Sequence, residues 1–149
     1  MRRPMEVVQV DKTVDVKWLG EGTRFVAEAE GGTVRLSSEL DAERDGPCPM
    51  DLLLVALGGC TATDVATVLR KMRQPLEALR VEVRGIDRDE DPQVWTDIEV
   101  VYHLTGDLDE AAVRRAIALS EEKYCCVEAQ VRGTARITSR YEIEPGRGP

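Results

Sequence analysis

One long helical segment, from Pro49 to about Met72, limits the possible folds of this chain more than any other feature. Proline suits the first turn of a helix, and the residues after it recur at three- and four-residue steps, as on one helix face. That face comprises Met50, Leu53, Leu57, Cys60, Asp64 and Val68. Such a helix is about 35 Å long, enough to cross a whole domain of this size. Because apolar residues also lie on its other sides, we expect more than one face to be buried.

Alternating apolar residues predict strands on both sides of this helix. Upstream, glycine-rich turns separate the alternating stretches, which predicts a three-stranded meander. Downstream, a hairpin and a final strand are predicted. The strands are expected at 8–18, 25–29, 34–36, 79–83, 98–104 and 135–143.

A second helical region is predicted between the hairpin and the final strand. Asp107 followed by Glu110 fits the reciprocal cap of a helix start, and apolar spacing continues that helix to Lys123. Residues 124–131 remain compatible with helix. The predicted order is therefore βββ-α-ββ-αα-β, in a single α+β domain over residues 1–149.

Composition and charge exclude several functions. The formal net charge of -8 argues against DNA, RNA and anionic membranes, because affinity for nucleic acid comes largely from Lys and Arg that neutralise phosphates. The start is too polar for a signal peptide, and the apolar stretch Leu52 to Leu57 falls far short of the ~20 residues of a membrane span. We therefore expect a cytoplasmic chain whose four cysteines are thiols, metal ligands or redox groups rather than a disulfide framework.

Cys60 is the first candidate for a functional thiol. It follows Gly58 and Gly59 in the middle of the long helix, where each glycine costs ~1 kcal/mol relative to alanine. Paired glycines in a helix interior are best explained by close approach of another backbone, or by space cleared beside the thiol for a substrate. A small core residue with glycines for helix packing is an equally good interpretation of Cys60 alone.

Cys125 and Cys126 form the second candidate. Adjacent side chains on a helix diverge by about 100°, so only one of them easily faces Cys60, and the spacing does not choose between them. If Cys125 lies at a break between two helices, free backbone N–H groups near its thiol would lower its pKa. Tyr124 would then shield this thiol.

Other chemistry at these residues has less support. No metal site is expected, because the chain has no C-x-x-C pair and adjacent cysteines rarely coordinate one ion. His103, the only histidine, alternates opposite the apolar residues of its strand, which favours a solvated position over the base of a cysteine–histidine hydrolase. Cys48, in a proline-flanked loop, is interpreted as a bystander thiol.

Two motifs resemble the OsmC/Ohr family, named for osmotically inducible protein C and organic hydroperoxide resistance. They are PMDLLLVALGGC at 49–60 and KYCCV at 123–127. The likeness spans nearly the whole chain and is closest to the YhfA-like branch. Members of the family are intertwined homodimers with two long central helices wrapped by sheets. The resemblance therefore implies an OsmC-like α+β fold, with the long helix packed on an antiparallel sheet and covered by a second subunit.

The resemblance also implies a thiol peroxidase that reduces organic hydroperoxides without a cofactor. Cys60 would attack the O–O bond and become a sulfenic acid, which Cys125 would resolve as a disulfide. A dithiol reductant of the lipoyl or thioredoxin type would reopen that disulfide. An apolar pocket between subunits, lined by Met50, Leu57 and Tyr124, would favour alkyl or lipid hydroperoxides over hydrogen peroxide.

The chain departs from the family pattern at the groups that activate the thiol. The peroxidase branches have Glu ten residues before the first cysteine, where this chain has Met50. Asp51 is a candidate replacement, turned by about 100°. Those branches also use an N-terminal arginine, for which Arg24 is the nearest match and Arg44 a second one, although either also fits a surface position. The alternative function is therefore a non-peroxidatic OsmC-like protein that binds a small ligand or senses redox state.

Overall fold

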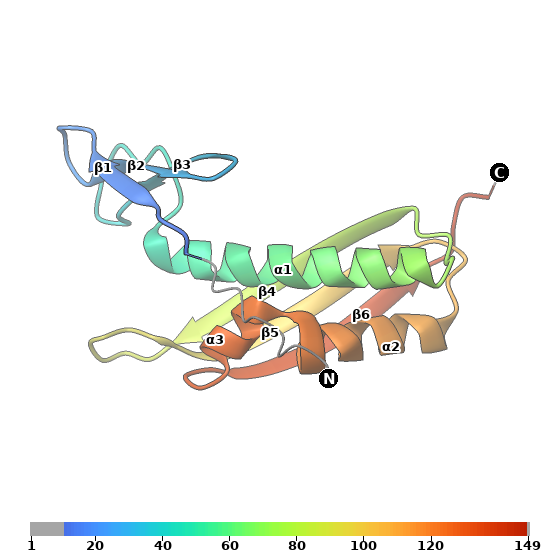
Figure 1. The fold of residues 1–149 in the computed structure, drawn as a ribbon. Helices are drawn as coiled ribbons and strands as arrows, with labels where there is room; N and C mark the ends of the chain where they lie inside the picture. The colour runs from blue at the N-terminus through green and yellow to red at the C-terminus, as the bar shows by residue number, and fades with distance from the viewer. Residues whose placement is uncertain (1–10, 149) are drawn as a thin grey trace, which may run out of the picture. The chain divides into compact units, whose positions relative to one another are not determined.

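The computed structural model describes residues 11–148, so residues 8–10 of the first predicted strand lie outside the described part. The chain forms two compact units, Met1–Asp51 and Leu52–Pro149. Each unit contains its own three-stranded sheet (Figure 1). The expectation of one domain over residues 1–149 stays a prediction.

The first unit contains the predicted antiparallel meander. Its strands are β1 (Asp15–Trp18), β2 (Arg24–Ala29) and β3 (Gly32–Ser37), paired in the order β1-β2-β3. Gly31 makes the tight turn between β2 and β3 with φ +93°, a left-handed conformation that glycine adopts without steric cost. The backbone N–H of Ser37 donates to the Pro47 carbonyl at 3.1 Å, which ties the end of β3 to the loop before the long helix.

The long helix and the elements after it follow the predicted order. They are α1 (Pro49–Lys71), β4 (Ala78–Asp87), β5 (Trp95–Thr105), α2 (Glu110–Leu119), the π-helical turn η1 (Ser120–Tyr124), α3 (Cys126–Val131) and β6 (Arg136–Glu144). Arg70 and Lys71 end α1, where positive charge complements the carboxyl end of the helix dipole. The order βββ-α-ββ-αα-β and the α+β class are confirmed.

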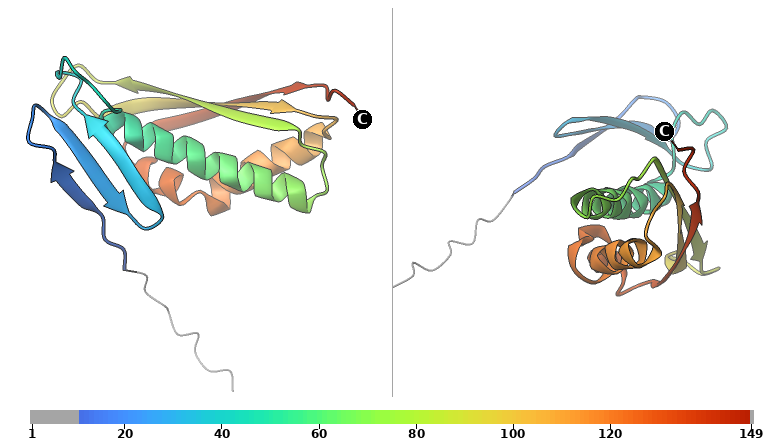
Figure 2. Two further views of the ribbon diagram at one scale, coloured as in Figure 1. Left: turned by 90° about the horizontal axis from the view of Figure 1, so that it is seen from above. Right: turned by 90° about the vertical axis from the view of Figure 1, so that its right-hand side faces the viewer.

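The sheet of the second unit is mixed rather than antiparallel throughout. Its order is β4-β5-β6, and β4 and β5 form the expected antiparallel hairpin, with Val81 opposite Tyr102. Strands β5 and β6 are parallel. Parallel neighbours need a long crossover connection, and the helical segments between β5 and β6 supply it. Figure 2 shows α1 and α2 on the same face of this sheet.

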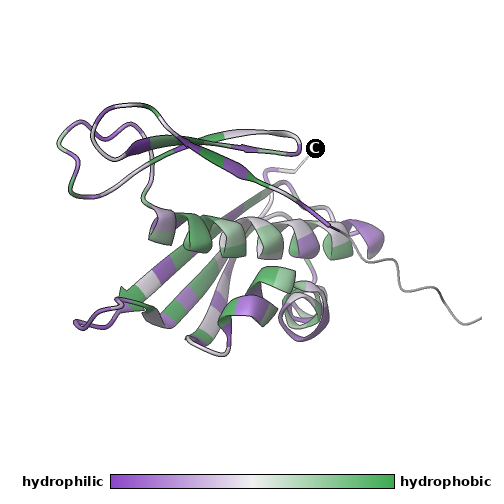
Figure 3. Cartoon of the chain, turned by 60° about the vertical axis from the view of Figure 1, so that its left-hand side comes forward, coloured by the Kyte–Doolittle hydropathy of each residue, from purple (hydrophilic) through white to green (hydrophobic). Residues whose placement is uncertain are grey.

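The core of the second unit lies between this sheet and the two helices. Alternate residues of β5 are buried against α1 and α2, and Figure 3 shows the corresponding alternation of apolar and polar bands along the strands. Tyr102 is fully buried at the centre of that strand. The core includes Leu57, Val65 and Leu69 from α1, Ile98, Val100, Tyr102 and Leu104 from β5, and Val113, Ala116 and Ile117 from α2.

Within the described chain, α1 buries a single stripe. The buried residues, spaced by four, are Leu57, Thr61, Val65 and Leu69. Leu53 and Val55 are 44% and 62% exposed, so the expected burial of a second face is not met inside one chain. By length and composition alone α1 would also suit a membrane span, which is weak evidence because core helices pass the same test.

The start of α2 differs from the predicted cap. Asp109, not Asp107, is the N-cap residue, and its carboxylate accepts the Ala111 N–H at 3.1 Å. The Asp109 N–H in turn donates to the Gln74 side chain at 2.8 Å. Both aspartates fit a helix start by composition, but the chain becomes helical only at Glu110, so the residue directly before it caps the helix.

Candidate thiol site

Cys60 and Cys125 lie side by side in the second unit, with Asp64 next to them. Their Sγ atoms and a carboxylate oxygen of Asp64 all lie within 4.8 Å of one another. Cys60 and Asp64 are one turn apart on α1 and share a helix face, whereas Cys125 joins η1 to α3. The fold therefore brings together two thiols that are far apart in the sequence.

Cys125 stands at a break between helical segments, as expected. It has extended backbone (φ -72°, ψ 100°) and caps α3, because its Sγ accepts the Glu128 N–H at 3.3 Å. The residue is only 4% exposed. The expected lowering of its pKa is wrong: burial raises the pKa of the Cys125 thiol, Cys60 raises it further, and the Glu128 N–H offsets only part of this. Cys125 is therefore a protonated thiol at neutral pH.

Cys60 is half-buried and is the more accessible of the two thiols. The glycines before it have different surroundings. A Cβ at Gly58 would lie 3.0 Å from a methyl group of Val83, so close packing of α1 on β4 explains this glycine, although a side chain rather than a backbone approaches. A Cβ at Gly59 would meet nothing within 4 Å. Gly59 therefore leaves open space on the helix directly before the thiol.

Ser120 connects η1 to the thiol cluster. Its hydroxyl is fully buried and donates to the Asp64 carboxylate at 2.9 Å. The sequence reasoning missed both Asp64 and Ser120 as neighbours of the thiols. The only available signal was that Asp64 shares a helix face with Cys60, whereas nothing in the local sequence points to Ser120.

Two further titratable groups lie in buried surroundings next to Cys125. Glu128 is 8% exposed, and burial, followed by the charge of Glu121, raises the pKa of its carboxyl. Tyr102 is fully buried, and burial raises the pKa of its hydroxyl far above the ordinary value, against a smaller lowering by Thr61. Sequence reasoning missed these residues as well. Glu128 directly follows the KYCCV motif, but its charge gives no sign of burial, and Tyr102 lies on a strand far from either motif in the sequence.

A pocket of about 470 Å³ opens beside Asp64. It is lined by Asp64, Thr67, Val68, Lys71, Met72, Leu119 and Tyr124. Tyr124, 45% exposed, lines this pocket, whereas its place in a substrate pocket between subunits stays a prediction. Leu57 does not line this pocket, because it is buried in the core. Met50 belongs to the first unit.

Both thiols of the cluster lie in a part of the chain that matches a known protein family. The family model described as OsmC-like protein matches residues 41–140. The chain belongs to the OsmC-like family. It is 39% identical over 129 residues to protein YhfA of Escherichia coli strain K12, covering 86% of this chain and 95% of that protein.

Solved structures share the OsmC-like fold. A hypothetical protein from Aquifex aeolicus matches with a TM-score of 0.85 at 29% identity, over 93% of this chain and 100% of that one. An organic hydroperoxide resistance protein OsmC from Legionella pneumophila matches with a TM-score of 0.66 at 16% identity, over 89% of this chain and 97% of that one. The second match shows the fold alone. The family resemblance and the OsmC-like fold are confirmed.

The other two cysteines of this OsmC-like chain have separate surroundings. Cys126 is exposed, and its Sγ donates to the Tyr124 carbonyl at 3.6 Å, so the thiol of the adjacent pair that meets Cys60 is Cys125. Cys48 is buried in the first unit, where its Sγ accepts the Asp51 N–H at 3.4 Å. Burial raises the pKa of the Cys48 thiol. Cys48 thus supports the first turn of α1, and its interpretation as a bystander thiol stays a prediction.

The residues expected to activate the thiol in an OsmC-like peroxidase all belong to the first unit. Arg24, on β2, forms an ion pair with Glu21, and Arg44 is exposed in the loop before α1. The Asp51 carboxylate lies within 4.8 Å of the Cys48 Sγ and the Glu39 carboxylate. Any action of Arg24 or Asp51 on Cys60 stays a prediction.

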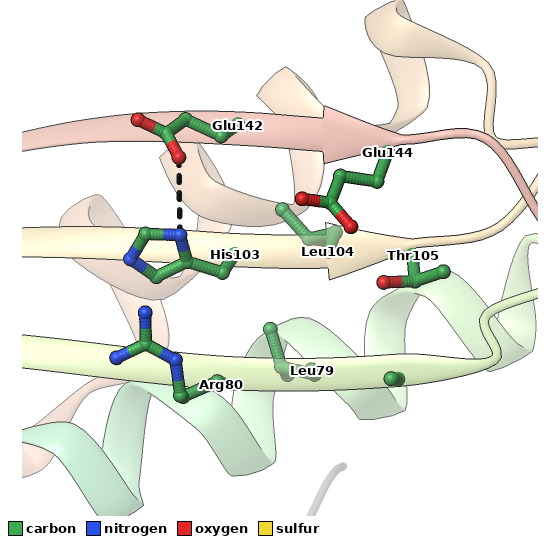
Figure 4. Close-up of a pocket in the computed structure, with 8 residues that line it drawn as sticks. Leu79, Arg80, His103, Leu104, Thr105, Glu142 and Glu144 are labelled. Atoms are coloured by element: carbon green, nitrogen blue, oxygen red, sulfur yellow. Dashed lines mark ion pairs between the residues drawn. The ribbon is translucent and has the colours of Figure 1, made fainter.

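His103 lies on the outer face of the second sheet, between acidic residues of both neighbouring strands. Its Nδ1 is 3.1 Å from a Glu142 carboxylate oxygen (Figure 4), and its Nε2 is 3.4 Å from Glu82. It lines a pocket of about 270 Å³ that neither Cys60 nor Cys125 lines. His103 is thus a half-buried strand residue among carboxylates, and the expectation that it is no base for a cysteine stays a prediction.

Proposed function

We propose that this OsmC-like protein is a thiol peroxidase that reduces organic hydroperoxides with Cys60 and Cys125. The observation that carries the proposal is the approach of the two Sγ atoms to within 4.8 Å of each other. Bonded sulfurs are about 2.05 Å apart, so the pair would have to close by side-chain rotation to form a disulfide. The Legionella pneumophila protein of similar fold is described as an organic hydroperoxide resistance protein, which is consistent with reduction of such peroxides by a thiol pair.

Exposure supports different roles for the two thiols. Cys60 is half-buried and can be reached by a peroxide, whereas Cys125 is almost fully buried and held as a protonated thiol. The accessible thiol is suited to attack the peroxide, and the buried thiol is suited to resolve the sulfenic acid that forms on its neighbour.

The proposed catalytic cycle has three steps: oxidation of Cys60, formation of the disulfide and its reduction. The Cys60 thiolate attacks one oxygen of ROOH, the O–O bond breaks, and ROH leaves after taking a proton, which makes Cys60 a sulfenic acid. The Cys125 sulfur attacks the sulfenic sulfur, a disulfide forms, and the oxygen leaves as water. A dithiol of the lipoyl or thioredoxin type then exchanges with this disulfide, becomes oxidised itself, and returns both cysteines to thiols.

The pocket beside Asp64 supports an apolar hydroperoxide as the substrate. Val68, Met72 and Leu119 contribute apolar surface to its lining, and Tyr124 contributes an aromatic ring. An alkyl or aryl group gains free energy by leaving water for such a surface, and hydrogen peroxide has no such group. We expect cumene hydroperoxide to react faster than hydrogen peroxide at equal concentration.

The proposed enzyme is a cytoplasmic homodimer in which a second copy covers the exposed face of α1. Leu53 and Val55 on this face are exposed, and burying such a side chain contributes about 1.5–3 kcal/mol. Light scattering should give the mass of two chains, and Val55→Glu should reduce it to one chain while exposed Thr138→Glu leaves it unchanged. A monomeric wild-type protein would contradict the dimer.

A second function is favoured by the residues around the first turn of α1. Met50 stands where the peroxidase branches have Glu, and the Asp51 carboxylate lies beside Cys48 and Glu39. With those groups unavailable for activation, the thiol pair would oxidise slowly and the protein would bind a small ligand in the pocket beside Asp64 or sense redox state.

One experiment separates the two functions. Reduced protein receives one equivalent of cumene hydroperoxide, and free thiols and intact mass are followed with time. The wild type should lose two thiols and two hydrogens, and Cys126→Ser should behave in the same way. Cys125→Ser should lose one thiol and gain one oxygen, because the sulfenic acid has no resolving partner. Cys60→Ser should react no faster than free cysteine.

Two results would decide against the peroxidase. If the wild type consumes the hydroperoxide no faster than free cysteine, the second function stands alone. If Cys60→Ser reacts as fast as the wild type, Cys60 is not the attacking thiol. Variants that retain the wild-type thermal unfolding curve exclude misfolding as the cause.

A further inference from the structure

The cluster of Cys60, Asp64 and Cys125 has a geometry that suits a metal ion. Its three donor atoms lie within 4.8 Å of one another. In tetrahedral zinc coordination, with Zn–S near 2.3 Å and Zn–O near 2.1 Å, neighbouring donor atoms are about 3.6–3.8 Å apart. Small side-chain rotations therefore bring all three donors onto one ion.

This donor set differs from the one that the sequence disfavours. The adjacent cysteines do not act together, because Cys126 is exposed and turned toward the Tyr124 carbonyl. The cluster instead combines Cys125 with two residues at i and i+4 of α1, a spacing that places two ligands on one helix face. The missing C-x-x-C pair is thus no objection to this site.

The donors of the cluster are held by further hydrogen bonds. The Ser120 hydroxyl donates to the Asp64 carboxylate at 2.9 Å, and the Glu128 N–H donates to the Cys125 Sγ at 3.3 Å. Contacts of this kind orient metal ligands and stabilise a thiolate that faces an ion. The cluster therefore has supporting contacts on two of its three ligands before any ion enters.

The charges around the cluster also favour a cation. Two thiolates and the Asp64 carboxylate would place three negative charges together, next to the buried Glu128 carboxyl. A divalent ion offsets this repulsion, because it is the largest local charge in such a site. Lys71 is the one positively charged residue among those that line the adjacent pocket.

The pocket beside Asp64 provides a path for the ion. Asp64 belongs both to this pocket, of about 470 Å³, and to the thiol cluster. A site with three protein ligands keeps a fourth position for water or a small molecule, and the pocket has room for either. Two thiolates select zinc over magnesium or calcium, which prefer oxygen ligands.

We propose that the reduced Cys60–Cys125 pair, together with Asp64, binds one Zn²⁺ ion. A disulfide between the two cysteines removes two of the three ligands, so the ion binds only the reduced pair and leaves when it is oxidised. Because Zn²⁺ occupies the Cys60 sulfur, it also competes with attack on a peroxide; only this last statement rests on the proposed function.

The test measures metal binding alone, without peroxide, so its failure and that of the peroxidase are distinguishable. Protein kept reduced with a phosphine is titrated with Zn²⁺ by calorimetry and with Co²⁺ by absorbance, where sulfur ligation gives a charge-transfer band. The variants are Cys60→Ser, Cys125→Ser and Asp64→Asn. Cys126→Ser and Cys48→Ser are the matched controls, the latter because Glu39, Cys48 and Asp51 form a second cluster of donors.

The wild type and both controls should bind one ion per chain with the charge-transfer band. Cys60→Ser and Cys125→Ser should bind about tenfold or more weakly with a weaker band, and Asp64→Asn should lose affinity but keep the band. Thermal unfolding of each metal-free variant checks that it is folded. Equal Zn²⁺ affinity in the wild type and Cys60→Ser, or loss of the band in Cys48→Ser, overturns the proposal.

Discussion

The hydroxyl of Ser120 donates a hydrogen bond to the carboxylate of Asp64 at 2.9 Å, and this bond ties η1 to α1 next to the two thiols. Ser120 is fully buried and Asp64 is half-buried, so neither partner exchanges freely for water. The bond fixes a carboxylate that has an oxygen within 4.8 Å of the Sγ atoms of Cys60 and Cys125. The cysteine motifs alone do not reveal this bond, which is the clearest structural support of the site.

Replacement of Ser120 by alanine tests how much this hydrogen bond contributes to stability. Ser120→Ala removes the donor and leaves the Asp64 carboxylate with an unmet hydrogen bond, so we expect a loss of about 1.5–3 kcal/mol in the free energy of unfolding. Urea denaturation measures it. Exposed Ser139→Ala is the control and should stay within about 0.5 kcal/mol of the wild type. Equal stability of the two variants would show that the bond does not form.

The paired glycines give a second prediction. Gly59→Ala should stabilise the fold by up to about 1 kcal/mol, because helix propensity improves and a Cβ meets nothing within 4 Å. Gly58→Ala should gain less or lose, because its Cβ lies 3.0 Å from the Val83 methyl group. Thermal unfolding of both variants ranks them. The reverse ranking would contradict the packing of α1 on β4.

The raised pKa of Cys125 predicts a loss of stability in alkali. Folding raises this pKa above the ordinary 9.0, so the folded chain keeps a proton that the unfolded chain releases. Stability is full below about pH 9 and falls above it, by at most about 1.4 kcal/mol per pH unit for one proton. Denaturation between pH 8 and about pH 10 measures the slope.

Two variants test whether the Cys125 thiol causes this fall in stability with pH. Cys125→Ser should flatten it, and exposed Cys126→Ser should not. Cys48, whose pKa is also raised, is retained in both variants, so its contribution cancels. Identical slopes in the two variants would mean that Cys125 is not the buried thiol described.

Glu128 affects the stability of the fold at lower pH, between about pH 4 and pH 7. Burial raises the pKa of its carboxyl above the ordinary 4.5, so its ionisation costs stability once the pH rises past that value. Glu128→Gln should therefore be more stable than the wild type at pH 7, and this advantage should vanish near pH 4. Exposed Glu122→Gln is the control and should show no such dependence. A constant difference at both pH values would contradict the burial of the charge.

Local periodicity was sufficient to predict most of the fold. The bounds of α1, Pro49–Lys71, follow from its proline and its three- and four-residue spacing, and the hairpin of β4 and β5 follows from alternation. The parallel pairing of β6 was not predictable, since it depends on how the crossover places that strand rather than on its own residues. The cap at Asp109 was not predicted, because Asp107 and Asp109 are equally suitable N-cap residues by type.

The candidate site was predicted only as far as its motifs reach. Cys60 and Cys125 were expected together from two family motifs, and the fold places them together. Asp64 and Ser120 were missed because their contact joins distant segments. The direction of the Cys125 pKa was also missed, because the sequence reveals the N–H groups of a helix break but not the depth of burial that outweighs them.

Mapping the bond that forms on oxidation is the most direct test of the thiol pair. Trypsin would leave Cys60 in a peptide with Cys48 and Cys125 in one with Cys126, so the Cys48→Ser, Cys126→Ser double variant is used. After one equivalent of cumene hydroperoxide, mass spectrometry of the non-reduced digest should find peptide 45–70 joined to peptide 124–132 within one chain. A Cys60 sulfenic acid without this link, or a link only between chains, would contradict the account.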